Sequence, residues 1–259
     1  MSDYLSDLLS KGELIFSKAS AMSVMDKSDA AIRNSIKRLV ASKKIVPLFK
    51  SYYLIVPPEY KQLGFVPPAL FIDDLMRSID ASYYVGLLSA ASFHGATHQA
   101  AQVFQVIVQT RLKPIVLGRT KIEFYFKKTL SDTPIQHLKT SRGPLNISTP
   151  EATAFDLLRY VHQSGNLNHV ATVLDELIDK ISPNMLVKTA RKFSLVYVQR
   201  LGYLLEILGH TKVATHLAHY VAEKNPSIYT PLRPGKTTTQ VEKNDKWHLI
   251  VNERIEPDL

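Results

Sequence analysis

The stretch SDAAIRNSIKRLVASKKI, residues 28–45, contains five lysines and arginines and a single acidic residue. Its apolar positions recur at i, i+4, i+7 and i+8, which predicts a helix with one face turned to a core. These positions are Ile32, Ile36, Leu39 and Val40. Ser28 suits the N-cap of this helix, and Asp29 follows at the positive end of the helix dipole. The cations therefore lie on the face that packing leaves free.

The segments on either side of this helix predict a small module. Two short helices are expected before it, at 2–11 and 17–25, with Ser2 capping the first. After it, KIVPLFKSYYLIV (44–56) predicts a β-hairpin that turns at Lys50–Ser51 without the glycine common in such turns. Three short helices and a hairpin within residues 1–56 predict a winged helix-turn-helix.

The charge of the chain is concentrated in this module. The formal net charge is +9 over 259 residues. Residues 27–53 contain seven lysines and arginines against one aspartate, a net charge of +6. A basic surface favours an anionic partner, and together with the helix order it predicts double-stranded DNA. The alternative interpretation of the same residues is a solvated basic face.

A recognition helix reads the major groove with exposed residues near its N-terminus, while flanking cations bind phosphates. Arg33, Asn34 and Lys37 are predicted to reach base edges. Tyr52 and Tyr53 alternate faces, so that one can contact the sugar-phosphate while the other packs inside. The predicted DNA-contacting residues are Lys27, Ser28, Arg33, Asn34, Lys37, Arg38, Lys43, Lys44, Lys50 and Tyr52.

The rest of the chain predicts a larger α+β domain with a small sheet and a helical subdomain, at 81–259. A proline-rich linker and connecting helix, 57–80, separates it from the winged helix-turn-helix domain, 1–56. The expected elements are a helix at 82–95, strands at 103–110, 121–128 and 143–149, and a series of helices from 148 onward. Ser148 and Glu151 have capping-box spacing at the start of that series.

A second basic stretch, residues 111–142, has two possible explanations. It contains eight lysines and arginines against two acidic residues. These cations could contact nucleic acid, or they could protect the edge of a sheet. The eight are Arg111, Lys113, Arg119, Lys121, Lys127, Lys128, Lys139 and Arg142.

The search for catalytic chemistry gives a negative expectation. No phosphate-binding glycine loop or hydrolase motif occurs, and the sequence has no cysteine. His94, His98, His210, His216 and His219 are interpreted as structural, and the acids of DELIDK (175–180) as solvent-facing. We therefore expect no catalytic residue, no metal and no cofactor. Without an apolar span or a secretion signal, we expect a cytoplasmic protein with no membrane association.

Several longer blocks resemble a known family, the AbiEi-type antitoxins of type IV toxin–antitoxin systems. These blocks are YYVGLLSAASFHGATHQ (83–99), VFQVIV, STPEATAFDLLRY, GNLNHVATVLDEL, QRLGYLLE, PLRPG and KWHLIVN. The resemblance implies a winged helix-turn-helix that binds inverted repeats in its own promoter and represses the operon. It also implies a C-terminal domain that counters a nucleotidyltransferase-like toxin, acting without a stable complex. Inverted repeats require two modules, which two monomers could supply on the DNA.

Two other functions stay open at this point. One is a nucleic-acid-processing enzyme with an N-terminal DNA-binding module, against which the lack of a carboxylate cluster argues. The other is a protein-interaction scaffold in the second domain.

Overall fold

The computed structural model describes residues 1–49, 51–61, 65–96 and 103–257. Contacts within the chain divide it into two units. The first unit comprises Met1–Val85, Gln102–Leu130 and His137–Asn146, and the second comprises Gly86–Ala101, Ser131–Gln136 and Ile147–Leu259. Helices and strands are both abundant, so the fold is mixed α+β, as the sequence predicts.

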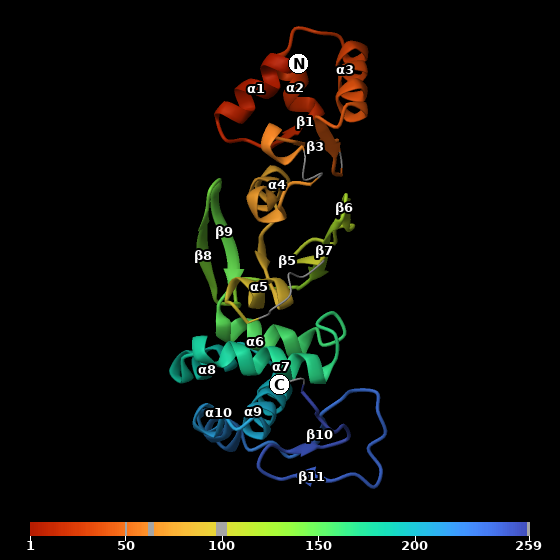
Figure 1. Ribbon diagram of the computed structural model, residues 1–259. Coiled ribbons are helices and arrows are strands. Elements are labelled where there is room, and N and C mark those ends of the chain that lie inside the picture. The colour runs from red at the N-terminus through yellow and green to blue at the C-terminus, as the bar shows by residue number, and fades with distance from the viewer. Residues whose placement is uncertain (50, 62–64, 97–102, 258–259) are drawn as a thin grey trace. The chain divides into compact units, whose positions relative to one another are not determined.

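Residues 1–56 form three helices and a three-stranded antiparallel sheet (Figure 1). The elements are α1 (Ser2–Ser10), β1 (Ile15–Ser17), α2 (Lys18–Val24), α3 (Asp29–Ala41), β2 (Ile45–Pro47) and β3 (Tyr52–Ile55). β3 is the central strand, pairing with the expected β2 and also with β1, which the sequence analysis does not predict. The expected cap of α1 is wrong: Met1 is the N-cap, and no side chain caps this helix.

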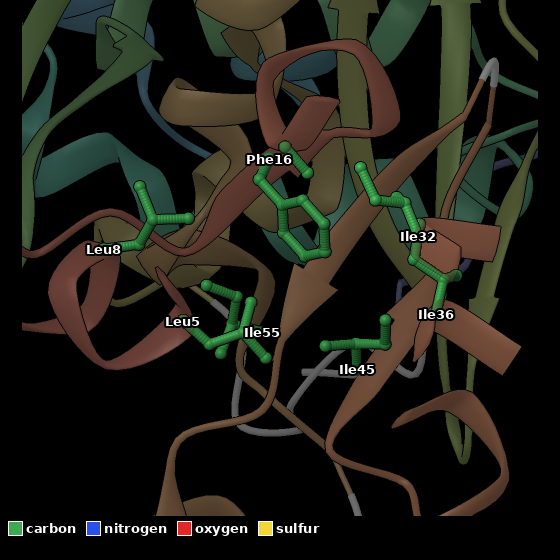
Figure 2. Close-up of a cluster of buried hydrophobic side chains, with 8 residues drawn as sticks. Leu5, Leu8, Phe16, Ile32, Ile36, Ile45 and Ile55 are labelled. Carbon is green, nitrogen blue, oxygen red and sulfur yellow. The ribbon is translucent and has the colours of Figure 1, made fainter. Parts of the chain in front are cut away.

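One apolar cluster holds these elements together (Figure 2). Its buried residues are Leu5, Leu8, Phe16, Ala21, Ile32, Ile36, Ile45 and Ile55. Leu39 and Val40 pack against it, so all four predicted apolar positions of α3 contribute. Burial of such side chains stabilises a fold by about 1.5–3 kcal/mol each, which fixes the rotation of α3 about its axis.

A six-stranded sheet lies mainly in the first unit, with the strand order β6-β7-β5-β4-β9-β8. β5 runs parallel to β7 and antiparallel to β4. The strands are β4 (Tyr83–Val85), β5 (Val103–Val108), β6 (Ile115–Leu117), β7 (Thr120–Phe126), β8 (Ile135–Thr140) and β9 (Gly143–Ser148). This sheet is larger than expected, because β4, β6 and β8 are added to the three predicted strands.

The expected helix at 82–95 is wrong in its first half. Tyr83–Val85 is strand β4, fully buried, and the helix α5 begins only at Leu87 and ends at Phe93. A run of aromatic and β-branched residues favours a strand, and Gly86 separates the two elements as the N-cap of α5. Gly95, with φ +79°, ends the helix as expected.

Five longer helices form the helical part of the second unit (Figure 1). They are α6 (Pro150–Arg159), α7 (Leu167–Leu177), α8 (Pro183–Ala190), α9 (Leu195–Ile207) and α10 (Thr211–Lys224). The predicted capping box at α6 is wrong. Thr149 is the N-cap, and its Oγ1 accepts a hydrogen bond from the amide of Ala152 at 3.3 Å. Glu151 instead accepts from the amide of Ser182 at 3.0 Å, and so is occupied elsewhere.

The remaining elements are short. They are η1 (Pro58–Tyr60), η2 (Pro68–Leu70), α4 (Ile72–Ser78), η3 (Ile178–Lys180), β10 (Thr230–Pro231), β11 (Lys243–Asn244) and β12 (Leu249–Ile250). The last three form a small sheet in the second unit, in the order β10-β12-β11. Next to it, Trp247 is fully buried, and its indole Nε1 donates a hydrogen bond to Glu206 of α9.

His94 at the end of α5 predicts how stability depends on pH. Burial lowers the pKa of its imidazole from 6.5, although the contact of Nε2 with the Ser148 carbonyl, at 2.8 Å, acts in the opposite direction. The folded state therefore favours neutral His94. The contribution of His94 to the free energy of unfolding is fully present above pH 6.5, and it decreases as the pH falls below 6.5 towards the pKa of the folded state. His94→Gln is expected to lose less of its free energy of unfolding as the pH falls below 6.5, as measured by urea unfolding at several pH values. An equal loss in both proteins would contradict it.

Candidate nucleic-acid interface

The candidate surface is the exposed side of α3 together with the residues that follow it; we call it the α3 basic face. It comprises Lys27, Ser28, Arg33, Asn34, Lys37, Arg38, Lys43 and Lys44, all of them exposed. Because Ile32 and Ile36 are buried in the core cluster, the intervening residues are directed outwards. The sequence pattern predicts this side of the helix correctly.

The start of α3 has the expected cap. Ser28 Oγ accepts a hydrogen bond from the amide of Ala31 at 3.3 Å, and the Ser28 backbone is extended. The first amides of a helix have no acceptor within the helix. Together with the positive end of the helix dipole, they favour an anion at this end of α3.

Asp29 is the one acidic residue in α3, and it binds two cations. Its carboxylate contacts Lys18 Nζ at 2.5 Å and Arg33 Nη2 at 2.8 Å. The hydrogen bond from Lys18 is the main reason that the pKa of Asp29 is lowered, with the charge of Arg33 adding to it. An exposed ion pair of this kind is weak, so Arg33 can exchange Asp29 for another acceptor at little cost.

The other cations of the α3 basic face carry uncompensated charge. Lys27, Lys37, Lys43 and Lys44 form no salt bridge within the described part of the chain. Arg38 donates one hydrogen bond to Ser35 Oγ at 3.5 Å and likewise forms no salt bridge with any described residue. The candidate surface therefore has a local excess of positive charge, and an anionic partner would neutralise it.

Lys43 has an unusual backbone conformation. It follows the C-cap of α3, Ser42, and its φ is +54°, in the left-handed region. The amide of Lys44 then donates to the Leu39 carbonyl at 2.9 Å. Glycine is the usual residue at such a helix end, because a side chain costs about 1–2 kcal/mol in this conformation. A lysine therefore occupies a position where glycine would fit better, and its charge is the property that glycine would lack.

The β2–β3 turn differs in part from the expectation. Ser51 supplies the positive φ, +64°, that a glycine would otherwise supply, and Lys50 lies outside the described residues. The Tyr52 hydroxyl donates to the carbonyl of Ser78 at 2.7 Å, and Tyr53 packs against Phe16 with ring centroids 5.4 Å apart. Both tyrosines are therefore engaged within the chain, and we leave Tyr52 out of the α3 basic face.

The second basic stretch, 111–142, is partly used inside the first unit. Lys127 is buried and donates to the Tyr84 hydroxyl at 3.0 Å. Lys121 pairs with Glu123 at 2.5 Å. Arg142 pairs with Glu59 at 3.2 Å, whereas Arg111, Lys113, Arg119, Lys128 and Lys139 are exposed.

His210 and His216 have local partners, and the expectation that the acids of DELIDK face solvent is wrong for Asp175, which is half-buried and contacts His210. His210 Nε2 lies 2.6 Å from Asp175 Oδ1, and His216 Nδ1 lies 2.9 Å from the carbonyl of Lys212. His98 lies outside the described residues. Within the described ranges, no group of three or more histidines and acids is placed to bind a metal. No helix in these ranges has the length and apolar character needed to cross a membrane.

Comparison with known proteins identifies part of the chain. Residues 84–207 match the family described as the AbiEi antitoxin C-terminal domain. The crystal structure of the Rv2827c protein from Mycobacterium tuberculosis has a similar fold, with a TM-score of 0.67 at 15% identity over 96% of this chain and 90% of that one. The antibiotic-resistance factor ANT(2'')-Ia aligns over 59% of this chain and 89% of its own, at 11% identity and a TM-score of only 0.27. No curated protein sequence matches the chain.

Proposed function

Since the chain is an AbiEi-type antitoxin, with its C-terminal antitoxin domain at residues 84–207, we propose that it also represses its own promoter by binding DNA through the α3 basic face. The observation behind this proposal is that α3 has a buried apolar side and an exposed cationic side with little internal compensation. In this proposal the chain has two roles: residues 1–56 bind operator DNA, and the antitoxin domain counters a toxin.

The arrangement of residues 1–56 supports the DNA-binding role. The order helix, strand, helix, helix and hairpin is the order expected of a winged helix-turn-helix, in which α3 would be the recognition helix. α2 and α3 are joined by a short connection, Met25–Ser28, as in a helix-turn-helix. In this proposal the β2–β3 turn would be the wing.

The residues of the α3 basic face have different proposed roles. Arg33 and Asn34 lie in the first half of α3, where side chains can reach the base edges of the major groove, and Lys37 follows one turn later. The backbone amides of the first turn of α3, which follow Ser28, would bind one phosphate together with Lys27. Lys43 and Lys44 at the other end of α3 would bind another, and so set the register of the protein on the duplex.

Lys43 allows this role to be tested separately from stability. Replacing Lys43 with glycine is expected to stabilise the protein by about 0.5–1 kcal/mol, because glycine tolerates the positive φ. The same change is expected to weaken binding to all DNA sequences alike. It should also reduce the slope of log affinity against log salt concentration by about one. Denaturant unfolding and fluorescence anisotropy with upstream DNA measure the two effects.

Ser51→Gly is the matched control for this experiment. It relieves a similar positive φ, +64°, in the same unit without removing a charge. We expect it to stabilise the protein comparably and to leave the salt slope unchanged. If Lys43→Gly and Ser51→Gly behaved alike towards DNA, a phosphate contact by Lys43 would be refuted.

The proposed partners are double-stranded DNA with inverted repeats and a nucleotidyltransferase-like toxin. Two repeats are proposed to recruit two monomers, which meet on the DNA. The toxin is proposed to be countered without a stable complex, in the cytoplasm. Co-expression of the chain with the protein encoded next to it tests this role, because rescue of growth without co-purification is the expected result. A stable co-purifying complex would contradict the proposed mode of action.

A further inference from the structure

Arg200 of α9 is a buried cation that has no acidic partner among the residues the structure describes. Only 8% of its surface is exposed. Its Nε and Nη2 both donate to the carbonyl of Pro231, at 3.1 and 2.8 Å, and Nη1 makes no hydrogen bond within the described part of the chain. Burial lowers the pKa of this guanidinium, and the residues acting on it include no carboxylate. A buried charge without a counter-charge is costly, so this arrangement favours the binding of an anion.

A small cavity lies beside Arg200, within the second unit. Its volume is about 50 Å³. The residues that line it are Leu158, Val161, His162, Gly165, Asn166, Leu167, Arg200, Leu232, Arg233 and Pro234. One water molecule needs roughly 10–15 Å³ measured in this way, so the cavity has room for a group of about three to five heavy atoms. That is the size of a phosphate and too small for a whole nucleotide.

The N-terminus of α7 borders the same cavity through Gly165, Asn166 and Leu167. Asn166 is the N-cap, and its Oδ1 accepts a hydrogen bond from the amide of His169 at 3.0 Å. The amide of Leu167 has no acceptor within the helix. This eleven-residue helix therefore presents the positive end of its dipole to the cavity that Arg200 lines.

The loop 231–236 completes the surroundings of the cavity. The buried Asn252 holds this loop, accepting from the amide of Arg233 and donating to its carbonyl, both at 2.9 Å. Arg233 pairs with Glu253 at 2.8 Å, and Lys236 Nζ lies 3.7 Å from the same carboxylate. Arg233 therefore has a carboxylate partner, whereas Arg200 has none among the described residues.

We propose that the cavity between Arg200 and the N-terminus of α7 binds a phosphate group. Arg200 would supply the charge and the Nη1 donor, the first turn of α7 would supply a backbone amide, and His162 at the surface would lie at the entrance. The group can be inorganic phosphate or the terminal phosphate of a larger molecule whose remainder stays outside. This site is separate from the α3 basic face, and neither proposal depends on the other.

The test is isothermal titration calorimetry of the full chain with inorganic phosphate and, in a second series, with a nucleoside 5′-monophosphate. We expect saturable binding of at least one of them. His162→Glu places a negative charge at the exposed entrance without disturbing the core, and is expected to weaken binding by about tenfold or more. Arg200→Gln is expected to abolish it. Tighter binding of the ester would identify a phosphate ester as the ligand, and the reverse would identify free phosphate.

Arg254→Gln is the matched control, because Arg254 is an exposed arginine of the same unit that lies outside the cavity. It should bind phosphate as the wild type does. The proposal is overturned if neither ligand binds, or if both bind His162→Glu as tightly as the wild type. The second result would show that phosphate binds elsewhere, for example at the α3 basic face. Since His162→Glu does not depend on changing a buried residue, it remains decisive even if Arg200→Gln fails to fold.

Discussion

Replacing Arg33 and Lys37 together with glutamine is expected to weaken binding to the upstream DNA by about 100-fold or more. A base-contacting arginine contributes about 1–3 kcal/mol, and a lysine on the same face adds a further salt-dependent part. Both side chains are exposed on α3, and among the described residues Arg33 has an acidic partner, Asp29, while Lys37 has none. Fluorescence anisotropy at fixed salt measures the change, and binding to unrelated DNA should decrease less than binding to the operator.

The same double variant separates the two proposed roles. The antitoxin domain at residues 84–207 is untouched, so protection from the toxin should persist when the chain is supplied from an unrelated promoter. Repression of the chain's own promoter should be lost. Lys11→Gln is the control, since Lys11 is an exposed cation of the first unit that pairs with Asp7 at 2.7 Å and lies at the end of α1. Unchanged repression by the double variant would refute the assignment of α3.

Gly202→Ala is expected to destabilise the second unit by about 3 kcal/mol or more. An added Cβ would lie 2.0 Å from Cζ3 and 2.1 Å from Cη2 of Trp247, which real structures do not allow. Trp247 is fully buried and bound to Glu206, so it can move only by disrupting its surroundings. Overpacking of a core typically costs 1–3 kcal/mol, and a rigid indole in direct conflict favours the upper end. Urea unfolding measures the loss.

The direction of this effect is diagnostic. In an uncrowded helix, replacing glycine with alanine stabilises by about 1 kcal/mol. A stabilised Gly202→Ala protein would therefore show that Trp247 does not pack against α9 as described. A smaller residue at position 247 provides the second check. Trp247→Leu alone is expected to be destabilising. In the Trp247→Leu background, Gly202→Ala should lower the free energy of unfolding by less than it does in the wild type, so the double-mutant cycle is non-additive.

The sequence predicts α3 well because its fold depends on local signals. The apolar spacing from Ile32 to Val40, the Ser28 cap and the neighbouring hairpin are all present within 30 residues. The helix at 82–95 is wrong for the complementary reason. YYV and the helix that follows form one apolar run, and periodicity alone does not separate a short buried strand from a buried helix. Gly86 is the signal that could have divided them.

The cavity beside Arg200 could not be predicted from local pattern. Arg200, Asn166 and Arg233 lie on three segments that are distant in sequence, and only folding brings them together. The block PLRPG, which forms part of the cavity, carries no motif of its own beyond the family resemblance. Similarly, nothing around Gly202 in the sequence indicates that an indole 45 residues later fills the space of its missing side chain. Such close approaches depend on tertiary packing.

Because the chain contains no cysteine, a single introduced thiol can locate α3 on DNA. Asn34→Cys would be labelled with a reagent that cleaves nearby DNA and then bound to the upstream region, with Asp7→Cys on α1 labelled as the control. We predict strand cleavage inside each inverted repeat from position 34 and none from position 7. Equal cleavage from both positions, or none from position 34 on fully bound DNA, would contradict the proposal that α3 lies in the major groove.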